Sequence, residues 1–262
     1  MKTEISYFGF SKVMLEKLIN YNDFKICSVI TQCGKSSNDF WELCKNNNIN
    51  CYSVDKKDLE KYANELSAKN VIMYEFGIIV PNAICSSFNI VNFHPGNLKT
   101  NRGANPISWS ILDPNIGAEI CAYRIIDQID CGYIISRKKE DVSDKDDPIS
   151  LKKKLELNID VMLKDVNQYF KFSSTYPTVY VENGIYRNRV KPIDYTIDLQ
   201  NDSPQIIIRK INSQIPYDGA IINIDGAINR VKKYNVSEDK ILMELDSGMV
   251  TYDILDKSFE MI

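Results

Sequence analysis

The sequence predicts an α/β protein in which a mostly parallel β-sheet is flanked by helices. Two observations support this class. Through the first half of the chain, strand-like and helix-like segments alternate, which is typical of a parallel sheet covered on both faces. The strand-like segments are short apolar runs, such as Phe24–Thr31 with its Ile and Val residues. In open sheets of this kind, ligands bind beyond the carboxyl ends of the strands.

The elements of this first half follow one another closely. Strands are expected at Ile5–Phe10, Phe24–Thr31, Ile49–Ser53, Asn70–Tyr74 and Phe88–Phe93. Helices are expected at Lys12–Asn20, Asp39–Asn47 and Leu59–Ala68, where apolar residues recur at helical spacing. Pro81 opens a further short helix before the last of these strands.

The next segments complete the main domain. Pro106–Leu112 reads as a short helix with proline in its first turn. Ala118–Ile126 and Gly132–Lys138 form two apolar strands joined by a turn. From Pro148 to Phe172, apolar residues recur at positions i, i+3 and i+4, which predicts one long amphipathic helix. We therefore expect a first domain over residues 1–172.

The remaining residues, 173–262, predict a small C-terminal α+β or β region. Pro204–Asn212 is helical in pattern, and three strand-like runs begin near Ile221, Ile241 and Val250. The region is smaller than most independent domains. We expect it to provide a dimerisation surface or a module that supports substrate binding.

Composition and charge exclude several classes of protein. The hydrophobic fraction of 44% with 26% charged residues is ordinary for a globular protein. No apolar stretch approaches the roughly 20 residues that span a bilayer, and the N-terminus does not resemble a signal peptide. From Ser173 onward, ten Lys and Arg stand against thirteen Asp and Glu. We expect neither a membrane nor a nucleic-acid partner, because binding many phosphates needs a basic face.

The cysteines and the single histidine argue against a metal site. The seven cysteines include no CxxC pair, and with one histidine a zinc site lacks a ligand set. Several cysteines stand inside apolar runs, where they act as small buried hydrophobic residues. We therefore expect no bound metal and a reducing, cytoplasmic compartment.

The single histidine, His94, lies where an apolar strand gives way to a loop. Asn92 is two positions earlier, so both side chains point to the same face of an extended strand. Imidazole transfers protons near neutral pH, and an amide donor beside such a base suits acyl transfer. The alternative is a histidine whose hydrogen bonds are simply satisfied at the end of a strand.

Two further segments extend this pattern into a family resemblance. Arg102, Gly103, Ala104, Asn105 and Pro106 begin ten residues after Asn92, and Asp130 precedes Cys131 and Gly132 in the turn between two strands. Aspartate is also a common turn residue, which is the alternative for Asp130 taken alone. Taken together, the order Asn-Phe-His-Pro, Arg-Gly-Ala-Asn-Pro and Asp-x-Gly resembles the formyltetrahydrofolate-dependent formyltransferase family. The resemblance covers most of residues 1–172.

The resemblance implies a Rossmann-like formyltransferase fold, with residues 1–172 as the catalytic domain. It also implies 10-formyltetrahydrofolate as co-substrate. In this family the asparagine donates to the formyl oxygen, the histidine acts as base and electrostatic partner, and the aspartate orients the histidine and water. Carried over to this chain, these roles belong to Asn92, His94 and Asp130.

The resemblance further implies a pterin pocket. The stretch Tyr74–Pro81 is similar to the family loop whose backbone binds the pterin, although it could also be a plain strand-to-helix connection. Asp127 is expected to contact the pterin from the other side of the pocket. The expected cofactor-binding residues are Phe76, Gly77, Ile78, Ile79 and Asp127.

Four residues are expected on the substrate side. In sugar-nucleotide members of the family, the region of Ser11 and Lys12 faces the pyrophosphate, whereas ordinary helix capping is the alternative for both residues. Arg102 and Asn105 lie in a segment that looks more like the sugar-nucleotide branch than the tRNA branch. Arg102 is equally suited to buttressing its loop.

The resemblance predicts an N-formyltransferase acting on a nucleotide-linked amino-dideoxysugar, such as a dTDP-3- or 4-amino-dideoxyhexose. We expect it to serve surface polysaccharide or O-antigen synthesis in the cytoplasm, as a homodimer. One alternative is a methionyl-tRNA formyltransferase, which the acidic C-terminal region disfavours. Another is a non-catalytic folate- or nucleotide-sugar-binding protein, against which the complete set of Asn92, His94 and Asp130 argues.

Overall fold

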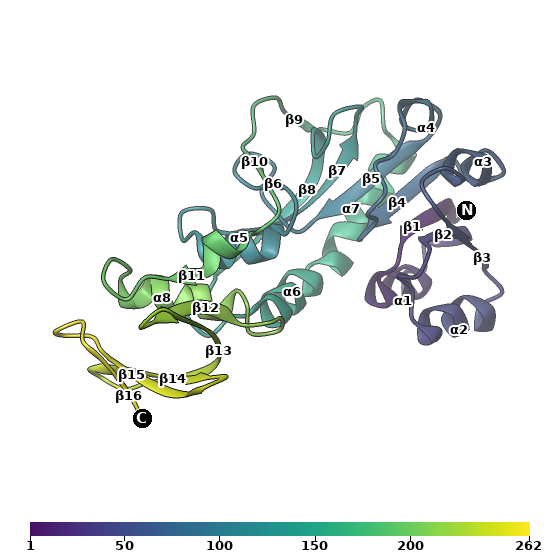
Figure 1. Ribbon diagram of the computed structural model, residues 1–262. Coiled ribbons are helices and arrows are strands. Elements are labelled where there is room, and N and C mark those ends of the chain that lie inside the picture. The colour runs from purple at the N-terminus through teal and green to yellow at the C-terminus, as the bar shows by residue number, and fades with distance from the viewer. The chain divides into compact units, whose positions relative to one another are not determined.

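The computed structural model describes all residues, 1–262, which divide into two compact units (Figure 1). The first unit comprises residues 1–102, 119–138 and 156–185. The second comprises residues 103–118, 139–155 and 186–262. Each unit is thus assembled from three segments, whereas the sequence suggested a single boundary near residue 172.

The first unit is built on an eight-stranded sheet with the order β3-β2-β1-β4-β5-β7-β8-β9. Neighbouring strands from β3 to β5 are parallel, and β5–β7 and β8–β9 are antiparallel. The predicted mostly parallel sheet is therefore confirmed. The strands are β1 (Thr3–Gly9), β2 (Phe24–Gln32), β3 (Asn50–Val54), β4 (Asn70–Tyr74), β5 (Asn89–His94), β7 (Ala118–Ile125), β8 (Gly132–Glu140) and β9 (Val179–Val181).

Helices pack on this sheet through their apolar faces. Ser11 and Ser37 cap α1 and α2, because each hydroxyl accepts a hydrogen bond from a backbone N–H of the first turn. One core cluster joins Phe8, Ile30 and Ile90 of the sheet to Leu59 and Ala63 of α3. The helices are α1 (Lys12–Asn20), α2 (Asn38–Asn46), α3 (Leu59–Asn64), α4 (Asn82–Ser87) and α7 (Ile159–Lys171).

The single long helix predicted over Pro148–Phe172 is wrong. The chain forms α6 (Pro148–Leu157) and then α7, with Asn158 between them. Asparagine is a weak helix former, so interrupting the helix at this position costs little free energy. The buried residues Leu155 and Ile159 keep the apolar spacing across the interruption, which is why the sequence pattern continues through it.

The second unit contains a six-stranded sheet with the order β11-β12-β13-β14-β15-β16. Neighbours from β12 to β16 are antiparallel, and α8 (Pro204–Asn212) contributes Ile207 and Ile211 to their core. Three strands match the predicted runs, but β13 was not predicted because it is polar and contains a bulge between Val231 and Lys233. The strands are β11 (Thr196–Ile197), β12 (Ala220–Ile224), β13 (Ala227–Val236), β14 (Lys240–Leu245), β15 (Gly248–Asp253) and β16 (Phe259–Met261).

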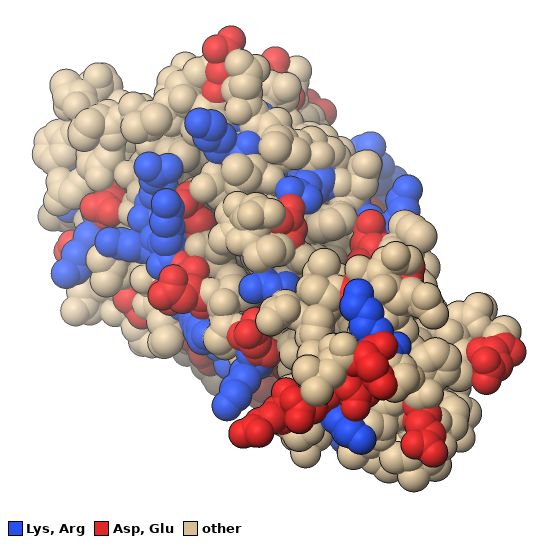
Figure 2. Space-filling view, turned by 90° about the vertical axis from the view of Figure 1, so that its left-hand side faces the viewer, with Lys and Arg blue, Asp and Glu red and all other residues tan.

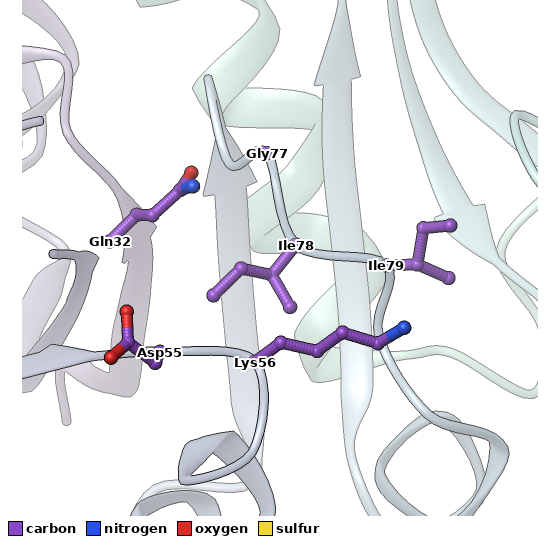
Figure 3. A pocket seen from close by; sticks show the side chains of 6 residues that line it. All are labelled: Gln32, Asp55, Lys56, Gly77, Ile78 and Ile79. Carbon is purple, nitrogen blue, oxygen red and sulfur yellow. The ribbon is translucent and has the colours of Figure 1, made fainter.

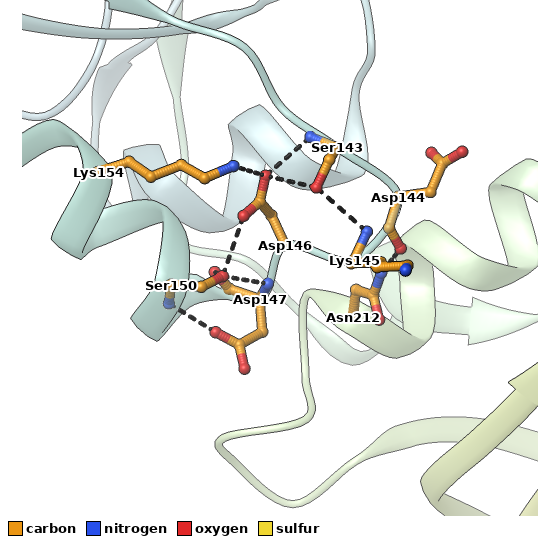
Figure 4. Close-up of polar contacts among 8 residues, drawn as sticks. All are labelled: Ser143, Asp144, Lys145, Asp146, Asp147, Ser150, Lys154 and Asn212. Atoms are coloured by element: carbon orange, nitrogen blue, oxygen red, sulfur yellow. Dashed lines mark hydrogen bonds and ion pairs between the residues drawn. The ribbon is translucent and has the colours of Figure 1, made fainter.

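A buried carboxylate organises the segment before α6 (Figure 4). Asp146 accepts hydrogen bonds from the backbone N–H and hydroxyl of Ser143 at 2.8 and 3.0 Å and from Lys154 at 2.6 Å. Asp147 and Ser150 cap the helix reciprocally, each side chain accepting from the other's backbone N–H. Asn212 of α8 donates to the carbonyl of Asp144 at 2.6 Å. The segment is therefore fixed to the second unit's core.

The remaining elements are short. Helix α5 (Pro106–Leu112) has proline in its first turn, as predicted, and a 3₁₀ turn follows much later at Pro192–Tyr195. Strands β6 (Arg102–Gly103) and β10 (Tyr186–Arg187) pair with each other. None of the helices combines the length and apolarity that crossing a bilayer requires.

Candidate active site

Asn92 of β5 and Tyr123 of β7 lie directly opposite each other in the antiparallel part of the first unit's sheet. Directly opposed side chains in such a pair point to the same face and come into contact. The amide Nδ2 of Asn92 donates to the hydroxyl of Tyr123 at 3.0 Å. This bond uses one N–H of the amide and leaves the second N–H on that nitrogen for another acceptor.

The hydroxyl of Tyr123 continues the chain of hydrogen bonds to a carboxylate. The hydroxyl donates its proton to Oδ1 of Asp130 at 2.9 Å. Its oxygen accepts from the Asn92 amide, so the two hydrogen bonds do not compete for the same proton. Burial, together with the nearby negative charge of Asp130, raises the pKa of Tyr123 well above its ordinary value. The phenol therefore stays protonated and remains a donor to Asp130.

The backbone of the turn between β7 and β8 presents Asp130 to this network. Asp130 has φ +47°, a left-handed conformation that aspartate adopts more readily than most residues. At Gly132 (φ +150°), a Cβ atom would stand 1.9 Å from the carbonyl oxygen of Arg124. Glycine is thus required two residues after the aspartate, which accounts for the Asp-x-Gly pattern.

His94 lies at the end of β5 and is 6% exposed. Its Nε2 is 2.9 Å from the carbonyl oxygen of Asn101, which can only accept, so this nitrogen carries a proton. In the neutral ring the lone pair is then on Nδ1, which is 3.8 Å from Oδ1 of Asp130. A proton taken up at Nδ1 would therefore face the carboxylate of Asp130.

Arg102 is a buttress of the Asp130 loop. Its side chain is buried and donates to the carbonyls of Leu98 and Val181 at 2.6 and 2.7 Å and to the Sγ of Cys131 at 2.6 Å. These bonds connect the loop after β5, β9 and the residue next to Asp130. They correspond to the buttressing alternative, and the contact of Arg102 with substrate stays a prediction.

Two residues of this face were not predicted from the sequence. Tyr123 and Glu119 occupy alternate positions of β7 and so share one face. Glu119 is 1% exposed and accepts from Cys121 at 2.8 Å and from Asn97 at 3.3 Å. The sequence did show polar side chains, Glu119 and Tyr123, within an otherwise apolar strand. Their hydrogen-bond partners could not be identified without the register of β7 against β5.

The loop predicted to bind the pterin has the properties that such a role needs. Phe76 packs on Phe8 with ring centroids 5.6 Å apart, and its cluster also includes Ile125 at the end of β7. From Phe76 to Ile79, the backbone makes no hydrogen bond to other backbone groups. Its donors and acceptors are therefore available to a flat polar heterocycle. Asp127, two residues after Ile125, is exposed.

The predicted substrate-side residues have ordinary structural partners. The Ser11 hydroxyl accepts from the N–H of Met14 at 3.3 Å and so caps α1. Lys12 pairs with Asp39 at 3.0 Å. Asn105 belongs to the second unit, where it precedes α5 with φ +56° and accepts from the N–H of Val190 at 3.3 Å.

This set combines the kinds of group that acyl transfer uses. Asn92 offers an amide donor, His94 a nitrogen that can bind a proton, and Asp130 a carboxylate 3.8 Å from the imidazole. A donor of this kind lowers the barrier for a developing oxyanion by roughly 3 kcal/mol. No group of three or more His, Cys, Asp and Glu side chains is placed to hold a metal ion.

The "Formyl transferase" family model matches residues 29–164, just over half of the chain. Among curated proteins, the methionyl-tRNA formyltransferase of Malacoplasma penetrans is 25% identical over 172 residues. That alignment covers 63% of this chain and 54% of the relative, so the chain spans about half the relative's length.

Two solved structures share the fold. A 4-N formyltransferase from Francisella tularensis is 20% identical with a TM-score of 0.64, covering 86% of this chain and 95% of that protein. WlaRD, a sugar 3N-formyl transferase crystallised in the presence of dTDP and 5-N-formyl-THF, is 16% identical with a TM-score of 0.61. Here the coverage is 93% of this chain and 94% of WlaRD.

Proposed function

Because the chain belongs to the formyl transferase family, we propose that it moves a formyl group from 10-formyltetrahydrofolate to the amine of a nucleotide-linked amino sugar. The network of Asn92, Tyr123, Asp130 and His94 carries this proposal, since it combines an oxyanion donor with a paired base. Family membership is in accord with the motifs that suggested it. The co-substrate supplies the activated formyl carbon.

Each residue of the network has a distinct task in this reaction. The free N–H of Asn92 donates to the formyl oxygen as negative charge develops there. The Nδ1 of His94 takes the proton that the attacking amine must lose and returns it to N10 of the folate as the bond between N10 and the formyl carbon breaks. Its Nε2–H stays bonded to the Asn101 carbonyl throughout. Asp130 stabilises the resulting imidazolium and is itself held by Tyr123.

The unpaired backbone from Phe76 to Ile79 supports binding of the pterin ring. Hydrogen bonds from a backbone recognise the ring's polar edge, and the neighbouring Phe76 ring offers an apolar contact. Asp127 is proposed to close the pocket from the β7–β8 turn, because Ile125 at the end of β7 already packs in the same cluster as Phe76.

The charge distribution supports a small acceptor. From Ser173 onward, acidic residues outnumber basic ones, thirteen to ten. On the face that Figure 2 shows, Lys and Arg lie among Asp and Glu without forming a continuous basic field. WlaRD, one of the structural neighbours that share the fold, is named as a sugar 3N-formyl transferase. A role in surface polysaccharide or O-antigen synthesis would follow from such a substrate.

Methionyl-tRNA formyltransferase remains the second candidate, because the curated relative carries that name. A tRNA acceptor would bring many phosphates to the protein, and its binding would weaken steeply with salt. A small nucleotide sugar would show only a weak dependence on salt.

Compartment and assembly complete the proposal. The seven cysteines are free thiols, in keeping with a reducing, cytoplasmic setting. Exposed apolar side chains at the last two strands, Met249, Phe259 and Met261, offer a surface for a homodimer. Light scattering at several protein concentrations tests the dimer.

The function is tested by a panel of acceptors with 10-formyltetrahydrofolate. dTDP-, UDP- and GDP-linked amino sugars and charged initiator tRNA are offered to wild-type protein and to His94→Asn, and mass spectrometry detects the added formyl group. We expect one amino-sugar nucleotide to be formylated, with turnover at least about 100-fold lower in His94→Asn. Formylation of the tRNA at a comparable or higher rate would overturn the ranking.

A further inference from the structure

A cavity of about 420 Å³ lies at the carboxyl ends of β2 and β3, beside the loop that follows β4 (Figure 3). All of its walls belong to the first unit. It is lined by Gln32, Asp55, Lys56, Gly77, Ile78 and Ile79. Gln32 is the last residue of β2, and Asp55 follows directly after β3. The network of Asn92 and His94 does not use this cavity.

Gln32 carries an unmet hydrogen-bonding group in this wall. Its Oε1 is buried and has no hydrogen-bond partner. The amide is packed against Gly77, where a Cβ atom would stand 2.7 Å from Oε1. Figure 3 shows the amide end of Gln32 beside Gly77. An unpaired buried acceptor is unfavourable, so turning this flexible amide toward an N–H donor in the cavity would lower the free energy.

The other lining groups match a flat ring with a polar edge. Ile78 is largely buried and Ile79 is 62% exposed, so the two side chains give this wall an apolar surface on which a flat ring can lie. Asp55 and Lys56 add an exposed acceptor and an exposed donor at the rim. A glutamine amide presents an acceptor and a donor together, which complements the edge of a nucleobase.

The cavity also lies at a suitable place in the sheet. The parallel strands β5, β4, β1, β2 and β3 are consecutive, so their carboxyl ends form one edge. Asn92 on β5 and Gln32 on β2 are three strand spacings apart, about 14 Å. Between them, β1 ends at the N-terminus of α1, where backbone N–H groups favour phosphate.

We propose that this cavity binds the nucleobase of the acceptor, with the Gln32 amide hydrogen-bonded to the base edge. The inference rests on the proposed function, because a nucleotide-linked sugar carries its base and its amine at opposite ends of a diphosphate. Laid along the edge of the sheet, the base contacts Gln32, the phosphates pass the start of α1, and the sugar amine reaches Asn92.

The co-substrate is a poorer occupant. Its formyl-bearing nitrogen is only two bonds from the pterin ring, so a pterin in this cavity would keep the formyl group away from Asn92. The cavity also contains the carboxylate of Asp55, which would repel a glutamate tail. The segment from Gly77 to Ile79 can thus contact both ligands, with its backbone toward the pterin and its isoleucine side chains toward the nucleobase.

Equilibrium binding tests the assignment with dTDP, UDP and GDP, inorganic pyrophosphate and 5-formyltetrahydrofolate as separate probes. Wild-type protein is compared with Gln32→Met, which keeps the side-chain length but removes both polar atoms. Gln168→Met, on the exposed face of α7, is the matched control. Gln32→Glu, which is isosteric but loses the amide donor, serves if the methionine variant is unstable in a melting experiment.

We expect Gln32→Met to raise the Kd of the preferred nucleoside diphosphate by about 5- to 100-fold. The Kd values for pyrophosphate and 5-formyltetrahydrofolate, and all values for Gln168→Met, stay unchanged. If wild type and both Gln32 variants bind the nucleotide equally well, the nucleobase site is wrong, whereas the proposed function still stands. If Gln32→Met instead weakens the binding of 5-formyltetrahydrofolate, the cavity belongs to the co-substrate and the nucleobase site is wrong. If the wild type binds no nucleotide, both this inference and the proposed function fail.

Discussion

The hydroxyl of Tyr123 donates a hydrogen bond to the carboxylate of Asp130 over 2.9 Å while it accepts one from Asn92 over 3.0 Å. One buried side chain therefore couples the amide that would meet the formyl oxygen to the carboxylate that faces His94. The direction of both bonds follows from chemistry, since the Asn92 amide can only donate from nitrogen and the Asp130 carboxylate can only accept.

Tyr123 is a positioning residue, and Tyr123→Phe isolates its role. We expect kcat to fall about tenfold and the free energy of unfolding to fall by about 1–2 kcal/mol, because both hydrogen bonds are lost. Tyr169→Phe is the control, since that hydroxyl makes one hydrogen bond, to Asn89 at 2.9 Å, away from the network. This variant should lose less stability than Tyr123→Phe, with kcat unchanged. Equal kcat values in the two variants would show that Tyr123 is structural only.

Arg102 is expected to act through the Asp130 loop. Arg102→Lys cannot make the three bonds of the guanidinium and leaves buried carbonyls unpaired, so unfolding free energy should fall by about 2 kcal/mol or more. Chemical denaturation measures this loss, and Arg189→Lys at an exposed position is the control. An unchanged stability with a raised KM for the acceptor would instead identify Arg102 as a substrate ligand.

The lowered pKa of Asp146 predicts that the free energy of unfolding depends on pH. Burial raises its pKa, but hydrogen bonds from Lys154 and Ser143 outweigh this effect and hold the pKa of Asp146 below its ordinary value. A lowered carboxyl pKa stabilises the fold fully above the unfolded-state value of about 3.9, and this contribution is lost as pH falls through the folded-state pKa.

Asp146→Asn removes this contribution. At pH 7 the variant should be about 1–3 kcal/mol less stable than the wild type, and the difference should shrink as pH falls below about 4. Urea denaturation of both proteins across this range measures it. A difference that stays constant with pH would mean that the charge of Asp146 is not what stabilises the segment.

Local sequence patterns were sufficient to predict the parallel half of the sheet and the motif residues. Asn92 and His94 are two residues apart on one strand, and Asp130 is fixed by a turn that needs Gly132. Tyr123 could not be predicted, because its role depends on the register of β7 against β5, which is a non-local pairing. Arg102 was ambiguous for the same reason, since its three partners lie on separate segments.

Other differences have local causes. The interruption at Asn158 preserves the apolar spacing of the helices on either side, so periodicity alone cannot reveal it. Strand β13 contains a bulge that breaks the two-residue alternation by which strands are recognised. The cavity beside Gln32 is formed by three segments that converge at one edge of the sheet, and the sequence does not indicate it.

Asp130→Asn is the sharpest test of whether Asn92, Asp130 and His94 together perform formyl transfer. The substitution keeps the size and the turn preference of the residue but removes the charge that faces Nδ1 of His94. With kcat and melting temperature measured on one preparation, we predict that kcat falls by about 10²–10⁴-fold while the melting temperature changes little. An unchanged kcat in the folded variant would show that the charge of Asp130 takes no part in the reaction.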